Sequence, residues 1–103
     1  MRRRAAKVDR NHAEIVETLR AAGCGVLDLS SVGNGCPDLL VHPPTFPACR
    51  IAVLMEVKDG SQPPSKRKLN PQQEKFHAQW KGWIHVVTSA ADALDVLGLG
   101  ERA

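Results

Sequence analysis

The stretch Ile51-Ala52-Val53-Leu54-Met55-Glu56-Val57-Lys58 contains the strongest β-strand signal of the chain, and the rest of the fold can be worked out from it. Its first half is apolar on both faces, which is typical of a central strand that is covered on two sides. Successive residues of a strand point to opposite faces, so Glu56 and Lys58 share a face with Leu54. That face changes from apolar to charged along the strand. We therefore expect the core to open to solvent at the charged end, where sites in α/β sheets form.

Helix and strand patterns continue on both sides of this strand. The segment before it has apolar residues at helical spacing, a stop at Gly23, and a turn over 31–35 with two glycines and an asparagine. The segment after it has a loop over 59–69, then Asn70 as N-cap and Pro71 in the first turn of a helix. The predicted elements are a helix over 8–22, strands over 24–30, 38–42 and 51–58, a helix over 71–80, a strand over 83–88, and a last helix capped by Ser89. The order α-β-β-β-α-β-α predicts a single α/β domain with a mixed four-stranded sheet flanked by helices.

The chain length of 103 residues corresponds to one domain with one modest core. We expect residues 1–7 to form a flexible basic tail and residues 8–100 to form the domain. No apolar run is long enough to span a membrane, and the Arg-rich start is not followed by the apolar stretch of a secretory signal. The three scattered cysteines fit a reducing compartment better than a disulfide framework, so the expected location is the cytoplasm.

Positive charge is mildly in excess, at +3, but it is gathered in two clusters. One cluster begins the chain and includes Arg3 and Arg4, and the other consists of Lys66, Arg67 and Lys68 in the loop after the central strand. Basic clusters favour partners that carry phosphate, although the same residues also serve as solubilising charge. With two Trp, two Phe and no Tyr, the chain has few residues for a platform that stacks single-stranded nucleic acid.

Asp38, at the start of the strand that precedes the central one, completes a group of charged residues. If the two strands pair in antiparallel fashion, the start of one lies beside the end of the other, so Asp38 meets Glu56 with Lys58 next to them. Two carboxylates in contact repel each other, and a divalent cation bound by both would relieve the repulsion. Such a cation would activate water and neutralise charge on a phosphate substrate. Taken separately, however, Pro37-Asp38 is a common turn dipeptide, and Glu56 with Lys58 can be a solvated pair.

The spacing of these residues resembles the signature of the PD-(D/E)XK nucleases, because Pro37-Asp38 is followed after 17 residues by Glu56-Val57-Lys58. The wider sequence is similar to the VRR-NUC family, including small phage-type members that resemble stand-alone Holliday-junction resolvases. The resemblance covers most of residues 8–97 and is carried by the stretches 11–19, 33–41, 54–60, 68–80 and 86–89. It implies a restriction-endonuclease-like domain, which agrees with the predicted element order.

The resemblance also implies roles for individual residues. Asp38 and Glu56 would bind the metal, with the backbone carbonyl of Val57 as a further ligand. Lys58 would position or activate the attacking water and stabilise charge in the transition state. Two more residues match family positions near the metal: Glu14 in the first helix, as an acidic residue of the metal site, and Gln73 in the second helix.

The residue patterns by themselves indicate other roles for Glu14 and Gln73. On a helical wheel Glu14 lies far from the apolar face, so the pattern alone makes it a surface residue. Gln73 stands three residues after Asn70, where glutamine commonly closes a capping box, and this role can coexist with one in the site. His77 and Trp80 are expected on the surface or packing edge of the same helix. The histidines and cysteines contain no C-x₂-C or H-x₃₋₅-H pair, which argues against zinc.

We therefore expect an endonuclease that uses Mg²⁺, with Mn²⁺ able to substitute, and that hydrolyses phosphodiester bonds in branched or junction DNA. The two basic clusters are the candidates for phosphate contacts. A symmetric cut needs two sites, so a homodimer is expected, with its contact on the last helix or around Trp80 and Trp83. The expected setting is a bacterial or phage-infected host cell. Two alternatives stay open: a non-catalytic DNA-binding or assembly module on the nuclease fold, and another phosphate chemistry, including a nuclease that acts on RNA.

Overall fold

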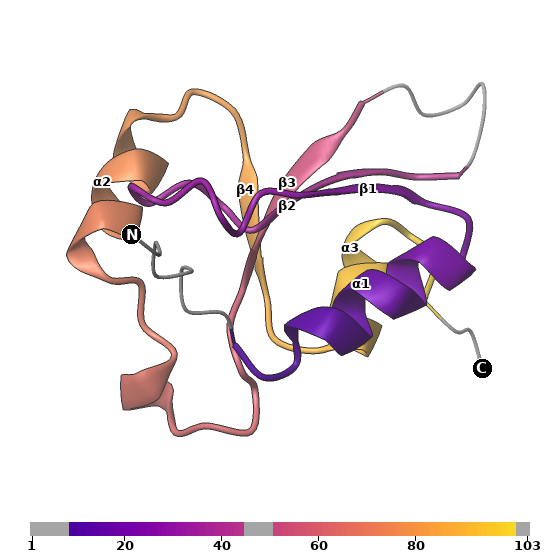
Figure 1. Cartoon of the computed structure of the whole chain (residues 1–103), viewed down its shortest axis with the longest axis horizontal. Helices are drawn as coiled ribbons and strands as arrows, with labels where there is room; N and C mark the ends of the chain where they lie inside the picture. The colour runs from indigo at the N-terminus through magenta and orange to yellow at the C-terminus, as the bar shows by residue number, and fades with distance from the viewer. Residues whose placement is uncertain (1–8, 45–50, 101–103) are drawn as a thin grey trace, which may run out of the picture.

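Four short strands form one mixed sheet in the computed structural model of the chain, which describes residues 9–44 and 51–100. In chain order the elements are α1 (His12–Ala21), β1 (Gly25–Asp28), β2 (Leu39–His42), β3 (Val53–Val57), the 3₁₀-helix η1 (Pro64–Lys66), α2 (Pro71–Gln79), β4 (Ile84–Val87) and α3 (Ala90–Val96). The strands lie in the order β1-β2-β3-β4; β2 is antiparallel to both its neighbours, and β3 is parallel to β4 (Figure 1). The predicted element order and mixed sheet are confirmed. The predicted basic tail over residues 1–7 lies outside the described residues.

Helices α1 and α3 pack on one face of the sheet and close the core there (Figure 1). Helix α1 begins later than predicted, because Asn11 still belongs to a turn, but its buried residues recur at the predicted helical spacing. A ring nitrogen of His12 lies 3.0 Å from Oδ2 of Asp28 and joins α1 to β1. None of the described helices is long and apolar enough to cross a membrane. The buried core residues are Ile15, Val16, Leu19, Cys24, Leu39, Val41, Met55, Val57, Val87 and Ala93.

The opposite face of the sheet is covered beside the end of β3, where α2 packs against the side chain of Glu56. Glu56 is 1% exposed and Lys58 9% exposed, whereas Ile51, upstream of the strand, is 71% exposed. The expectation that the core opens to solvent at the charged end is therefore wrong. After β3 the chain turns back across the charged end of the strand and places α2 over it. Strand pairing of β3 begins only at Val53, so the apolar residues at the start of the strand are not covered by α2.

The first turn of α2 is held both by its own cap and by a neighbouring turn. Asn70 accepts a hydrogen bond from the backbone N–H of Gln73, and the Gln73 side chain accepts one from the backbone N–H of Asn70, so the predicted capping box is confirmed. The turn before β2 approaches this helix closely at Gly35, whose φ is +81°. A Cβ atom at Gly35 would collide with the backbone carbonyl of Gln72. The predicted turn is thus also the surface against which the first turn of α2 packs.

Substitution of Gly35 by alanine is expected to weaken the packing of α2 against the turn before β2 and so to lower the free energy of unfolding. Gly33 offers a matched control, because its φ of +79° is nearly the same but a Cβ there would meet nothing within 4 Å. Gly33→Ala should lower the free energy of unfolding by about 1–2 kcal/mol, the cost of a left-handed backbone. Gly35→Ala should lower it by about 1–3 kcal/mol more, because the collision displaces packed backbone. Urea unfolding of both variants measures the difference, and equal losses would show that the close approach contributes nothing.

Candidate active site

The antiparallel register of β2 and β3 brings Asp38 and Glu56 together. Leu39 pairs with Met55, so the residues one step further on each strand, Asp38 and Glu56, lie opposite each other. The backbone N–H of Val57 donates a hydrogen bond of 2.8 Å to Oδ2 of Asp38, which fixes this carboxylate against the end of β3. The predicted antiparallel pairing is confirmed, and two carboxylates 18 positions apart in the chain become neighbours.

Burial and charge act together on Glu56. Its burial, followed by the hydrogen bond and the charge of the adjacent Asp38, raises the pKa of its carboxyl group well above the ordinary value. Its Oε1 atom is buried and has no hydrogen-bond partner in the described part of the chain. A carboxylate kept in this position favours either a proton or a cation, since an isolated buried anion is strongly disfavoured.

Gln73 of α2 joins Lys58 to Glu56. The ammonium Nζ of Lys58 donates a 2.8 Å hydrogen bond to Oε1 of Gln73, and Nε2 of Gln73 donates one of 3.0 Å to Oε2 of Glu56. The same Oε1 also accepts from the backbone of Asn70 in the capping box. One amide therefore caps the helix and also contacts both members of the charged pair, which leaves room for the predicted role of Gln73 in the site.

His77 also faces this cluster, which its sequence pattern did not indicate. Its Nε2 lies 3.6 Å from Oε1 of Glu56, and its side chain is 17% exposed. Burial, with a smaller effect of Lys58, lowers the pKa of His77, so the neutral ring is favoured. His77 lies four residues after Gln73, so both side chains project from one face of α2. This spacing is the feature of the sequence that could have placed His77 at the cluster.

Two residues at the start of α1 border the same end of the sheet. Asn11 donates from its side chain to the backbone carbonyls of Lys58, at 3.2 Å, and Thr88, at 3.0 Å, and so ties the helix to the ends of β3 and β4. Burial raises the pKa of Asp9, while Lys58 lowers it and Asp38 raises it by smaller amounts. Asp9 is thus an acidic neighbour of the cluster. No motif marked Asp9, whereas Asn11 begins the stretch 11–19 that carries the family resemblance.

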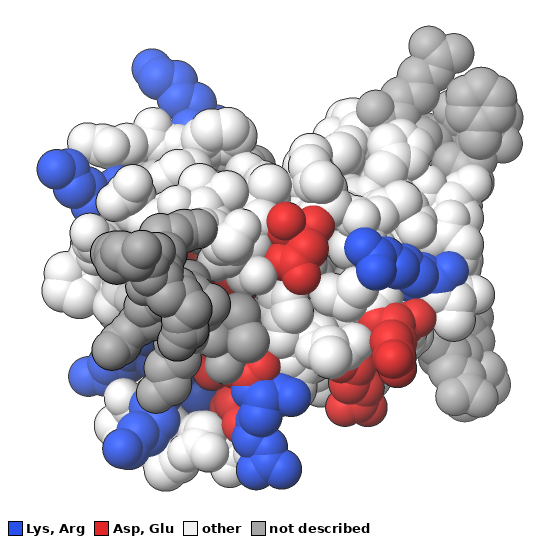
Figure 2. All heavy atoms as spheres, viewed as in Figure 1, with Lys and Arg blue, Asp and Glu red and all other residues white. Residues whose placement is uncertain are grey.

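The other predicted site residues lie around this centre. Glu14 is exposed on α1 and lines a polar surface hollow together with Arg10, Asp59 and Ser89, among others. This hollow is not lined by Asp38, Glu56, Lys58 or Gln73. Lys66 and Lys68 are exposed and Arg67 is half-buried, while Arg3 and Arg4 lie outside the described residues. Figure 2 shows basic side chains on the side of the molecule that carries α2, with acidic ones between them at its lower edge.

The donor atoms at this centre suit a hard divalent cation. Asp38 and Glu56 offer carboxylate oxygens, and Val57, the last residue of β3, adjoins both, although a role for its carbonyl stays a prediction. Across residues 9–44 and 51–100, no three His, Cys, Asp or Glu side chains form a ready-made metal cage. The set therefore fits a cation that takes few protein ligands and completes its shell with water and phosphate, as Mg²⁺ does.

Comparison with known proteins places this geometry in a wider context. No family model and no curated protein sequence matches the chain. A solved structure described as a "VRR_NUC domain" matches it with a TM-score of 0.58 and 28% sequence identity. The alignment covers 86% of this chain and 91% of that one, so the similarity extends over most of the domain rather than over one motif.

Glu56→Gln is expected to stabilise the metal-free protein increasingly as the pH rises. The pKa of Glu56 is raised from 4.5 to about 9 by folding, so the stability contributed by its protonated form is complete below pH 4.5 and is lost as the pH rises toward 9. Glutamine stays neutral throughout, so the gap in unfolding free energy between variant and wild type should widen across this interval. Urea unfolding in the presence of EDTA measures the gap.

The matched control is Glu74→Gln, a change of the same type on the exposed side of α2. A gap between Glu56→Gln and wild type that stays constant over the whole pH interval would contradict the raised pKa. Added Mg²⁺ should stabilise the wild type and the Glu74→Gln variant but not Glu56→Gln, because a ligand must be ionised to bind a cation.

Proposed function

We propose that this chain, a nuclease-fold domain similar over most of its length to a solved VRR_NUC domain, is a metal-dependent endodeoxyribonuclease of the VRR-NUC family. The observation that carries the proposal is the pairing of the half-buried Asp38 with the buried Glu56, with the buried Lys58 beside them. A carboxylate pair without a neutralising partner is costly in a folded protein, and a cation-binding role gives a reason to retain it. A module that only binds DNA needs no such pair.

The division of labour among the residues follows from their contacts. Asp38 and Glu56, with the carbonyl of Val57, would hold Mg²⁺, and Mn²⁺ would substitute for it. The bound cation would supply water activation and neutralise charge on the scissile phosphate. Lys58 would orient the attacking water and balance the charge that grows on the phosphoryl oxygens as the new P–O bond forms and the ester bond breaks.

Gln73 would hold the side chains of Lys58 and Glu56 in fixed positions relative to each other, because it is hydrogen-bonded to both in the structure. Glu14, which is exposed on α1, is proposed to contact the metal site only indirectly, through a water.

Phosphate contacts are proposed for the basic loop, which consists of Lys66, Arg67 and Lys68. In the sequence this loop lies between β3, which carries Glu56, and α2, which carries Gln73, so it connects two elements of the charged centre. The charges of this loop, of which Lys66 and Lys68 are exposed, suit the backbone of duplex DNA and do not read bases. Arg3 and Arg4 are proposed to add further contacts. Branched or junction DNA is the substrate that this shape-dependent mode of binding favours.

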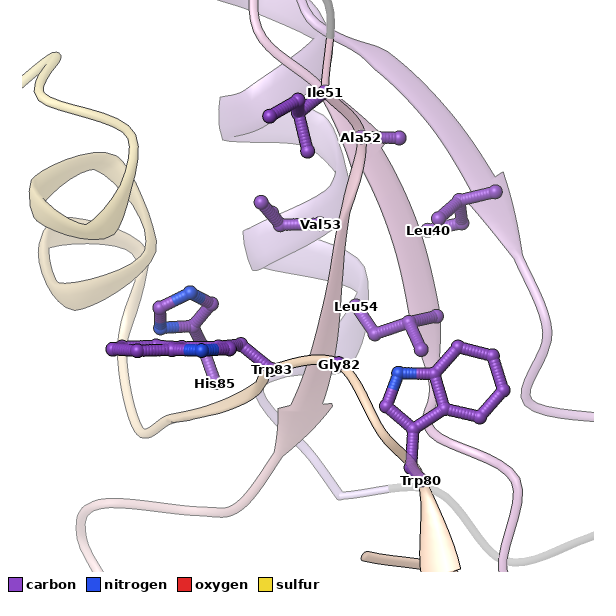
Figure 3. A pocket seen from close by; sticks show the side chains of 9 residues that line it. All are labelled: Leu40, Ile51, Ala52, Val53, Leu54, Trp80, Gly82, Trp83 and His85. Carbon is purple, nitrogen blue, oxygen red and sulfur yellow. The ribbon is translucent and has the colours of Figure 1, made fainter.

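A homodimer is proposed around an apolar hollow of about 620 Å³ at the uncovered start of β3 (Figure 3). Leu54 and Trp80 line it on one side of the strand, and Trp83 and His85 on the other. Trp83 is 82% exposed and Trp80 46%, and exposed aromatic groups of this size typically mark interfaces. A second copy seated here would leave both charged centres free, because they lie at the other end of β3. Sedimentation equilibrium measures this association directly.

The cytoplasm is proposed as the location. Cys24 and Cys36 are free thiols, which suits a reducing compartment.

Asp38→Asn and Lys58→Ala should each reduce cleavage of a four-way DNA junction by at least about 100-fold in Mg²⁺, because each removes a group that acts on the transition state. Gel assays with plasmid, junction and single-stranded substrates, in Mg²⁺, Mn²⁺ or EDTA, measure the rates. Asp95→Asn on α3 and Lys75→Ala on α2 are exposed controls that should keep wild-type rates. Absence of cleavage with either metal would favour the non-catalytic binding module, and cleavage of RNA alone would redirect the proposal to that substrate.

Replacement of the whole basic loop by alanine should weaken DNA binding without altering the fold. Each phosphate contact contributes about 0.9 to the slope of log affinity against log salt, so the triple variant should lower the slope by about 2–3. Fluorescence anisotropy over a salt titration measures this slope. The control is Arg20→Ala, which removes one positive charge from α1. An unchanged slope in the triple variant would place the phosphate contacts elsewhere.

A further inference from the structure

Helix α2 reaches both oxygens of the Glu56 carboxylate. Nε2 of Gln73 donates to Oε2 at 3.0 Å, and Nε2 of His77 faces Oε1 at 3.6 Å. The two helix residues are four positions apart, so they project from the same face one turn from each other. The carboxylate plane is therefore bracketed by two side chains of a single rigid element.

The second of these approaches is incomplete in the structure. Oε1 of Glu56 and Nε2 of His77 are both buried, and neither has a hydrogen-bond partner among the described residues. Buried polar atoms without partners are uncommon, and these two face each other. Closure by about 0.6 Å would bring them within hydrogen-bonding distance. Such contacts at catalytic centres are often long before ligands bind and shorten afterwards.

We infer that His77 is a positioning residue for Glu56, holding Oε1 by donation from Nε2 while Gln73 holds Oε2. The inference rests on the proposed function, since it assigns His77 to the metal site of the same centre. His77 acts through Glu56 and not as a ligand, because its ring forms no cage with Asp38 and Glu56 in the part of the chain that the structure describes. Fixing both oxygens keeps the carboxylate oriented toward the cation.

The competing explanation is that His77 merely fills space under α2. Two substitutions separate the explanations. His77→Phe keeps an aromatic ring of similar volume but removes the nitrogen, whereas His77→Gln loses the ring but can place an amide N–H near the position of Nε2. A packing role predicts that phenylalanine is the better replacement, and a positioning role predicts that glutamine is.

The test measures Mn²⁺ binding to the full chain without DNA, by the electron paramagnetic resonance signal of free Mn²⁺. His77→Phe should raise the dissociation constant for Mn²⁺ by about 10–100-fold, as loss of a partner of a metal ligand typically does. His77→Gln should lose much less affinity than His77→Phe, because its amide N–H can donate to Oε1 in place of Nε2. His42→Phe, at the end of β2 that lies away from Asp38, is the matched control and should bind as wild type does. Thermal melts confirm that each variant is folded.

Each result decides a separate question. Wild-type affinity in His77→Phe, or a greater loss in His77→Gln than in His77→Phe, would overturn the positioning role while leaving the proposed nuclease intact. Nitrogen-14 coupling from an imidazole in the spin-echo spectrum of wild-type Mn²⁺ protein would overturn it in favour of direct ligation. Failure of the wild type to bind Mn²⁺ and to cleave DNA would overturn the proposed function together with the inference.

Discussion

The carboxylates of Asp38 and Glu56 lie side by side at the buried end of β3, and most of the surrounding structure can be understood as a response to that placement. Two like charges in a weakly polar environment repel each other and lose hydration. The strand register forces them together, because Leu39 is paired with Met55 by main-chain bonds that the side chains cannot alter. The structure answers by binding Asp38 to a backbone N–H and by shifting the pKa of Glu56 upward.

Helix α2 supplies the remaining compensation, and its position depends on features far from the charges. Gln73 is held by its cap with Asn70, and this hold directs its amide toward both Lys58 and Glu56. Gly35 lets the preceding turn come close enough to seat the helix. The charged centre is therefore ordered by a helix cap and by a turn, neither of which carries chemistry of its own. A nuclease built in this way would be preorganised before its metal and substrate arrive.

The uncovered part of the sheet follows from the same arrangement. Because α2 lies over the charged end of β3, it does not also cover the apolar start of the strand, and no other helix of the described residues does so. Trp80 and Trp83 remain exposed beside this apolar surface. The direction in which the chain turns back after β3 therefore has two results: it buries the charged end of the strand, and it leaves the apolar start exposed.

The pattern of local residues was sufficient to predict the element order, the mixed sheet, the cap of α2 and the pairing of Asp38 with Glu56. These features depend on alternation, helical spacing and turn residues, which act over a few positions of the chain. The burial of Glu56 and Lys58 was predicted wrongly, and the approach of His77 was missed. Both depend on where α2 packs after a loop of irregular structure, and local preferences do not specify that direction. Sequence by itself determined which elements form and which carboxylates meet; the tertiary structure decided which end of the strand is covered, because only long-range packing sets the solvent exposure of a charge.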